Sequence, residues 1–186
     1  MLENNIIVEL TINGQKVKVG HKFLEDISMN IPDVKENSKI FTILAYSDNF
    51  EARDNIARKD NLSLEAIDTL LNDASDNIID RILSNRDVNK YITNEQIFSI
   101  IEKNNIKLLS TIAENIDEFH SCDKCEILNT LVKHKSSKVK AALFSYSVSD
   151  LLSIEKLKEL SNDEDFDVAT EAKKELKNKL EKNWSY

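Results

Sequence analysis

Apolar positions in this chain recur in a unit of about 30 residues. The unit is clearest at residues 49–72, where two short segments with apolar faces, 50–57 and 64–71, flank a polar turn. Ser63 is placed to cap the second segment, because its hydroxyl can accept a free amide of the first helical turn. The apolar stripe of that segment has helical spacing and consists of Ile67, Leu70 and Leu71. The pattern predicts a pair of short helices.

Two series of apolar markers advance together along the chain. The residue that opens each first helix recurs at steps of 28, 28, 33 and 29, as Phe50, Ile78, Ile106, Val139 and Val168. The stripe on each second helix recurs at steps of 30, 31 and 29, as Leu70-Leu71, Ile100-Ile101, Leu131-Val132 and Leu160-Ser161. A helix pair of this size cannot bury its own apolar face, so each pair needs neighbours. We therefore expect a mainly α protein whose helix pairs stack as an α-solenoid.

The pattern divides the chain into three regions. In residues 1–20, apolar and polar residues alternate around Asn13-Gly14, which predicts an N-terminal β-hairpin that caps the helices. The edge of this hairpin could instead pair with a strand of another chain. Residues 21–46 resemble a degenerate first helix pair, and residues 47–186 hold the regular repeats, ending in a charged capping helix.

Composition excludes several classes of enzyme. The chain has two glycines, Gly14 and Gly20, and one proline, Pro32. This excludes most β-rich folds, whose tight turns need positive φ, and it removes the glycine-rich loops that hold phosphates. The sequence also offers no Ser/His/Asp arrangement typical of nucleophilic catalysis. We expect a protein that is not an enzyme, with no catalytic residue and no cofactor.

The net charge of −8 is unevenly distributed. Residues 47–126 contain 17 acidic and 9 basic residues, whereas the rest of the chain has 16 of each. This acidic centre argues against nucleic acid as a ligand. The sequence contains no membrane-spanning apolar run, no evident signal peptide and no disulfide framework. We therefore expect a cytoplasmic protein.

One stretch carries a family resemblance. Residues 55–71, Asn-Ile-Ala-Arg-Lys-Asp-Asn-Leu-Ser-Leu-Glu-Ala-Ile-Asp-Thr-Leu-Leu, resemble bacterial HEAT-like repeats, most closely the leucine-rich-repeat-variant subtype. The resemblance extends over roughly residues 47–182 and implies a curved, right-handed α-solenoid that presents a surface to another protein. The chain lacks the proline-marked turns of that subtype and the cysteine cluster that binds an iron–sulfur centre in some members. The resemblance therefore implies no cofactor.

In such solenoids the second helix of each pair usually lines the concave face. The outward positions expected on these helices are Glu65, Asp68, Gln96, Ser99, Glu126, Asn129, Lys156 and Glu159. Because the central repeats are acidic, we expect a protein partner with basic character. The resulting hypothesis is a non-catalytic adaptor or regulator that binds its partner on the concave face.

Nucleic-acid binding is one alternative function. Some HEAT-like proteins, the alkylpurine DNA glycosylases, act on DNA through a basic concave face with aromatic base contacts. The acidic centre and the single tryptophan, Trp184, oppose this alternative. One basic cluster crosses a predicted turn and could contact phosphate or an acidic partner, or simply be solvated: Lys133, His134, Lys135, Lys138 and Lys140.

A zinc or redox switch is the other alternative. The candidate ligands are His120, Cys122, Cys125 and His134. Their spacing fits no familiar zinc finger, and at about 1.5 Å per helical residue His134 would lie about 13 Å from the start of its helix. Nearby acids, Asp117 and Glu118, oppose a reactive thiolate. We therefore predict no metal site here, and the switch remains an alternative.

Overall fold

The computed structural model describes residues 10–17, 20–145 and 147–183. This part of the chain is mainly α-helical, as the apolar periodicity predicts. The chain forms two compact units, unit 1 (residues 1–89) and unit 2 (residues 90–186). No described helix is long and apolar enough to cross a membrane.

Unit 1 begins with a short antiparallel hairpin. Strands β1 (Leu10–Ile12) and β2 (Gln15–Val17) pair so that Leu10 lies opposite Val17. Asn13 and Gly14 between them have φ values of 50° and 80°, the positive angles that a two-residue type I′ turn requires. The other residues of the predicted hairpin, 5–9 and 18–19, lie outside the described residues, and its capping role stays a prediction.

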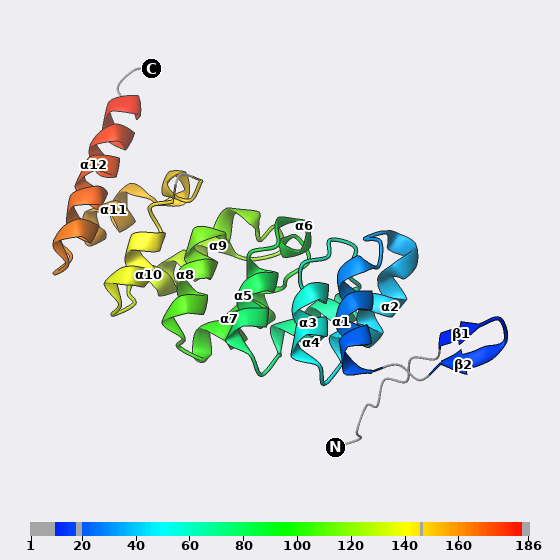
Figure 1. The fold of residues 1–186 in the computed structure, drawn as a ribbon. Helices are drawn as coiled ribbons and strands as arrows, with labels where there is room; N and C mark the ends of the chain where they lie inside the picture. The colour runs from blue at the N-terminus through cyan, green and yellow to red at the C-terminus, as the bar shows by residue number, and fades with distance from the viewer. Residues whose placement is uncertain (1–9, 18–19, 146, 184–186) are drawn as a thin grey trace. The chain divides into compact units, whose positions relative to one another are not determined.

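The helices of unit 1 alternate between two layers (Figure 1). They are α1 (His21–Asn30), the 3-10 helix η1 (Lys35–Asn37), α2 (Ser38–Ala45), α3 (Phe50–Ile56), α4 (Leu64–Leu71), α5 (Asp76–Leu83) and α6 (Arg86–Asn89). The first helices are in contact in order, α1 with α3 and α3 with α5, and the second helices α2 and α4 also pack together. Buried side chains from both layers, such as Phe41, Ile56 and Leu70, form the core between them.

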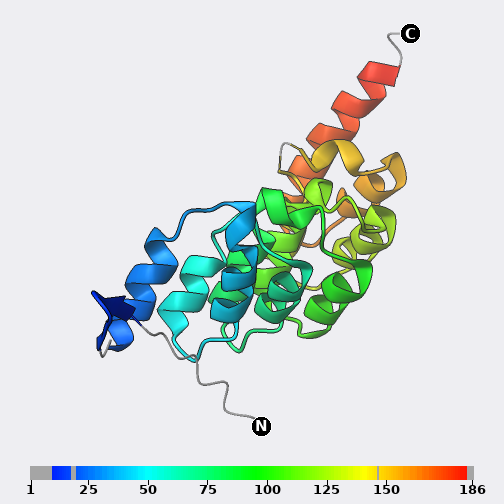
Figure 2. The same cartoon turned by 90° about the vertical axis from the view of Figure 1, so that its right-hand side faces the viewer.

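Unit 2 has the same alternation of helices. Its elements are α7 (Asn94–Glu102), α8 (Ile106–Glu114), the 3-10 helix η2 (Ile116–Glu118), α9 (Lys124–Val132), α10 (Ser137–Ala142), the 3-10 helix η3 (Ser149–Leu151), α11 (Ile154–Leu160) and α12 (Phe166–Asn183). Helix α8 packs on α10 and α10 on α12, while α9 packs on α11. The distal half of α12 extends past its neighbours (Figures 1 and 2). Each unit thus has the stacked helix pairs of an α-solenoid.

Four of the second helices, α4, α7, α9 and α11, begin at a strict interval. Their N-caps lie 30 residues apart and are Ser63, Thr93, Asp123 and Ser153. Each cap side chain accepts a hydrogen bond from the backbone N–H three residues later, at 3.0, 3.4, 3.1 and 3.3 Å respectively. These bonds satisfy amides that a helix start leaves unpaired. The caps therefore mark the start of these second helices at the same position of each repeat.

Several large apolar residues at helical positions are exposed. On α2, Ile40 and Ile43 are 41% and 54% exposed, because the helix buries its opposite side through Phe41 and Leu44. Phe50 and Ile106, the first residues of α3 and α8, are 39% and 45% exposed. The buried positions of these helices come at least one residue later.

Two connections between longer helices contain helical structure and core residues. The connection from α5 to α7 contains α6, and Val88 and Ile92 there are fully buried. The connection from α8 to α9 contains η2, together with the buried residues Ile116 and Phe119. These connections therefore contribute to the apolar core.

Candidate functional site

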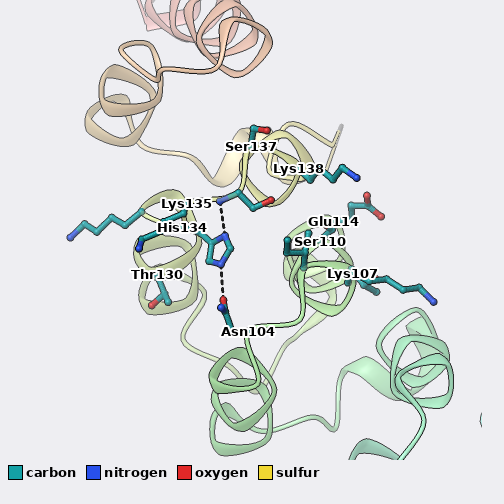
Figure 3. A pocket seen from close by; sticks show the side chains of 13 residues that line it. Asn104, Lys107, Ser110, Glu114, Thr130, His134, Lys135, Ser137 and Lys138 are labelled. Carbon is teal, nitrogen blue, oxygen red and sulfur yellow. Dashed lines mark hydrogen bonds between the residues drawn. The ribbon is translucent and has the colours of Figure 1, made fainter.

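A broad groove in unit 2, called here the lysine groove, lies between one face of α8 and the turn that joins α9 to α10 (Figure 3). Its volume is about 1290 Å³. The residues that line it are Asn104, Ile106, Lys107, Ser110, Thr111, Glu114, Thr130, Lys133, His134, Lys135, Ser136, Ser137 and Lys138. Most of these side chains carry a charge, a hydroxyl or an amide.

The amphipathic sequence of α8 forms one wall of the groove. Asn105 caps this helix by accepting hydrogen bonds from the backbone N–H groups of Lys107 (2.9 Å) and Leu108 (3.3 Å). The core-facing side of α8 buries leucine and isoleucine. Its groove side consists of Lys107, Ser110, Thr111 and Glu114, whose spacing of three, four and seven residues places them on one face.

His134 links two consecutive inter-repeat turns at the groove. Its Nδ1 accepts a hydrogen bond from the backbone N–H of Ser136 at 3.0 Å. Its Nε2 lies 2.9 Å from Oδ1 of Asn104. Because the backbone N–H can only donate, Nδ1 must be unprotonated, so Nε2 carries the hydrogen and donates it to Asn104. Both ring nitrogens are therefore occupied within the protein.

Burial and a nearby positive charge favour the neutral form of His134. Burial lowers the pKa of His134 below its ordinary value of 6.5, and the positive charge of Lys140 lowers it further. The neutral ring is the form that can accept the Ser136 N–H, so the pKa shift and the hydrogen bonds favour the same state. His134 is thus a structural link between turns at neutral pH.

The basic cluster expected from the sequence divides into two groups. Lys133, Lys135 and Lys138 line the groove and form no ion pair with any described residue. Lys140 instead pairs with Asp163, and both side chains are largely buried, at 12% and 11% exposure. The groove gains Lys107 from α8 and contains one carboxylate, Glu114. With His134 neutral, four lysines and one glutamate give the groove a formal charge of +3.

The eight positions expected to bind a partner lie elsewhere. None of them is among the described residues that line the lysine groove. Six are exposed, namely Glu65, Asp68, Ser99, Glu126, Asn129 and Glu159, and two are half-buried, namely Gln96 and Lys156. The amide oxygen of Gln96 accepts the backbone N–H of Thr93 at 3.0 Å, which completes a capping box on α7. Gln96 thus has a local structural role.

The four candidate metal ligands do not come together. Cys122 is half-buried and donates its thiol to the carbonyl oxygen of Ile92 at 3.3 Å. Burial raises its pKa to about 11, with a further contribution from Glu95 and a smaller opposing one from Lys124. His120 and Cys125 are exposed, and the ring nitrogens of His134 are occupied as described above. Among the described residues, no group of three or more His, Cys, Asp or Glu is arranged to bind a metal.

No protein-family model and no curated protein matches this chain. The chain is similar in fold to designed armadillo repeat proteins. One, YIII(Dq.V1)4CPAF in complex with the peptide (KR)4, is 16% identical over 84% of this chain and 90% of that chain, with a TM-score of 0.37. Another, YIII(Dq)4CqI, is 18% identical over 83% of this chain and 90% of that chain, with a TM-score of 0.31. Similarity at this level says nothing about the ligand of this chain.

Proposed function

We propose that this chain is a non-catalytic protein-interaction module, an adaptor or regulator that binds a partner through the outward side chains of its second helices. The proposal rests on a mixed apolar and acidic surface on α2 and α4 of unit 1, called here the α2–α4 surface. Four residues define it: Ile43, Tyr46, Leu64 and Glu65. Such a surface favours a protein ligand, because exposed apolar side chains beside a carboxylate suit a protein interface, whereas a polyanion would be repelled.

Contacts between α2 and α4 bring these residues onto one surface. The hydroxyls of Thr42 and Ser63 are 2.7 Å apart. The Tyr46 hydroxyl donates to Oε1 of Glu65 at 3.2 Å. Leu64, which directly precedes Glu65, is 66% exposed. An exposed leucine beside a carboxylate and a tyrosine suits a partner that offers an apolar residue next to a basic one.

Asp68 extends the acidic part of this surface along α4. It lies three residues after Glu65, so the two side chains occupy neighbouring positions on the outer side of the helix. Both are exposed. This pair supports a partner of basic character. Within unit 2, the outward positions of α7, α9 and α11 are further candidates for contact with a protein partner.

The repeat subtype and the cellular compartment are also part of this proposal. The resemblance of residues 55–71 supports a bacterial HEAT-like array of the leucine-rich-repeat-variant subtype, with the second helices on the concave side. An interaction module of this kind would act in the cytoplasm. It would need no catalytic group and no cofactor for binding.

Charge reversal on α4 tests the proposed function. The double variant Glu65→Lys/Asp68→Lys should capture the native partner at least about tenfold more weakly, because it places two ammonium groups opposite basic side chains. Partners are captured from the native cell on immobilised wild-type protein and quantified by mass spectrometry, with circular dichroism as the folding check. The control Glu164→Lys/Glu181→Lys makes the same charge change at exposed positions of unit 2. Equal capture by wild type and the α4 variant would exclude this surface.

A further inference from the structure

We propose that the lysine groove of unit 2 binds an extended acidic peptide, a segment of a protein in which Asp or Glu residues flank an apolar residue. This site is separate from the α2–α4 surface, which lies in unit 1 and suits a basic partner. The groove and its lining residues lie wholly within unit 2. The inference therefore holds or fails independently of the proposed function.

The charge of the groove contrasts with that of the chain. The chain has a net charge of −8, whereas the groove lining has a formal charge of +3. Lys133, Lys135 and Lys138 have no carboxylate partner among the described residues, unlike Lys140, whose charge Asp163 neutralises. These three ammonium groups around one groove create a local positive potential that attracts carboxylates.

The polar lining also provides hydrogen-bond donors for a peptide. Hydroxyl groups lie on both walls, namely Ser110 on α8 and Ser137 on α10, whereas the hydroxyl of Thr130 on α9 already donates to the carbonyl oxygen of Glu126 at 3.1 Å. A hydroxyl can donate to a side-chain carboxylate or to a peptide carbonyl and can accept a peptide N–H. This combination suits an extended chain, which presents both kinds of backbone group along its length.

Size favours a peptide over a small anion. The volume of about 1290 Å³ exceeds the roughly 300–1,000 Å³ of typical small-molecule pockets. A single phosphate or carboxylate would leave most of the groove empty. A segment of several residues could instead reach both Lys107 on α8 and Lys135 in the opposite turn.

The residue types favour carboxylates over phosphate or nucleic acid. Arginine, whose fork binds phosphate at two points, does not occur after Arg86 in this sequence. Glu114 lies within the groove and would repel a continuous phosphate backbone. Carboxylates spaced along a peptide can contact the lysines and avoid Glu114.

Ile106 gives the groove an apolar contact point. It is 45% exposed at the first position of α8 and belongs to the groove lining. Burying such a residue under an apolar side chain of the ligand would add affinity that electrostatics alone does not provide. This is why the proposed peptide carries an apolar residue between its acids.

Fluorescence anisotropy tests the site with a fluorescein-labelled peptide of six glutamates around a central leucine. The variant Lys133→Glu/Lys135→Glu should bind it at least about tenfold more weakly than wild type, because two attractive charges become repulsive. The control Lys158→Glu/Lys173→Glu makes the same charge change at exposed sites outside the groove and should bind like wild type. Circular dichroism confirms that each variant folds.

A second variant separates the apolar contact from the charges. Ile106→Ser should weaken the leucine-containing peptide but leave an all-glutamate peptide unchanged. No binding by wild type, or equal weakening in the groove and control variants, would overturn the proposal. It would also be overturned if inorganic phosphate or a short DNA duplex displaced the peptide at lower concentration than unlabelled peptide does, because the site would then prefer phosphate.

Discussion

Arg53 and Asp73 form a two-point ion pair that ties a first helix to the turn after its second helix. The guanidinium Nε donates to Oδ2 at 2.6 Å, and Nη2 donates to Oδ1 at 3.3 Å. Arg53 also donates from Nη1 to the carbonyl oxygen of Ser47 at 2.8 Å, in the turn that precedes α3. Asp73 Oδ1 in turn accepts the backbone N–H of Ser75 at 2.8 Å. One side chain thus fixes the turns at both ends of the repeat.

Unit 2 contains an equivalent pair. Lys140 occupies the fourth position after the cap residue of α10, as Arg53 does in α3, and it pairs with Asp163 in the turn after α11. Asp163 accepts the backbone N–H of Asp165 at 3.0 Å, as Asp73 accepts that of Ser75. Although burial alone would raise the pKa of Asp163, the hydrogen bonds from Lys140 and Asp165 lower it below 3.8 overall. Unit 2 therefore has the same ion pair between a first helix and the following turn, with lysine in place of arginine.

Removing the arginine should destabilise unit 1. Arg53→Met leaves Asp73, whose side chain is 5% exposed, without its counter-ion, so we expect a loss of about 3–5 kcal/mol in unfolding free energy. The control Lys174→Met breaks a pair on α12 whose lysine is 62% exposed and should cost less than about 1 kcal/mol. Urea denaturation followed by circular dichroism measures both. Similar losses for the two variants would contradict a structural role for Arg53.

The helix caps should differ in strength according to their hydrogen bonds. Asp123 accepts two backbone N–H groups, from Cys125 at 3.0 Å and Glu126 at 3.1 Å, whereas Ser153 accepts one at 3.3 Å. Replacing Asp123 by alanine should cost about 1–2 kcal/mol, and replacing Ser153 about 0.5–1 kcal/mol. Thermal unfolding gives the order. An exposed serine without a cap role, Ser99, serves as the control.

Much of this architecture could be predicted from local sequence. The helix expected at residues 64–71 is α4, because cap residue and apolar stripe lie within one short segment. The contacts between repeats could not be predicted in this way. Arg53 binds Asp73, which lies 20 residues later, and Arg81 approaches Asp54, which lies 27 residues earlier, at 3.4 Å. The packing of neighbouring helices, not the local sequence, brings these partners together.

Only one wall of the lysine groove could be recognised from the sequence. The run from Lys133 to Lys138 is contiguous, so its charge is plain from composition. The opposite wall comes from α8, about 25 residues earlier, and only the packing of α8 on α10 brings Lys107 and Glu114 beside that run. Lys140, on the same helix α10, instead pairs with Asp163 in the turn after α11. Tertiary contacts therefore decide which lysines belong to the groove.

His134 should make stability depend on pH. Its pKa in the folded chain lies below 6.5, the ordinary value expected in the unfolded chain. As pH falls through 6.5, the unfolded chain therefore takes up a proton before the folded chain does, and the free energy of unfolding decreases. The loss levels off once the pH is below the pKa of the folded state. Protonation at Nδ1 would also break the hydrogen bond from Ser136.

His134→Asn provides the matched variant for this measurement. Asparagine keeps a side-chain oxygen that can accept the Ser136 N–H, as Asp73 and Asp163 do in the equivalent turns, but it does not titrate. Urea midpoints of wild type and variant are compared at pH 7.5 and 5.5. Wild type should lose more stability than the variant over this interval. A parallel change in both proteins would show that other groups cause the pH dependence.

The two cysteines should react with alkylating reagents at different rates. The thiolate is the reactive form, and the pKa of Cys122 is raised to about 11 by burial and by Glu95. Its thiol also donates to Ile92, whereas Cys125 is exposed on α9. Iodoacetamide at neutral pH should therefore label Cys122 at least about tenfold more slowly than Cys125. Trypsin cleavage after Lys124 separates the two cysteines for mass spectrometry, and urea-unfolded protein should lose the difference. Faster labelling of Cys122 in the folded protein would instead support a reactive thiol and revive the redox switch.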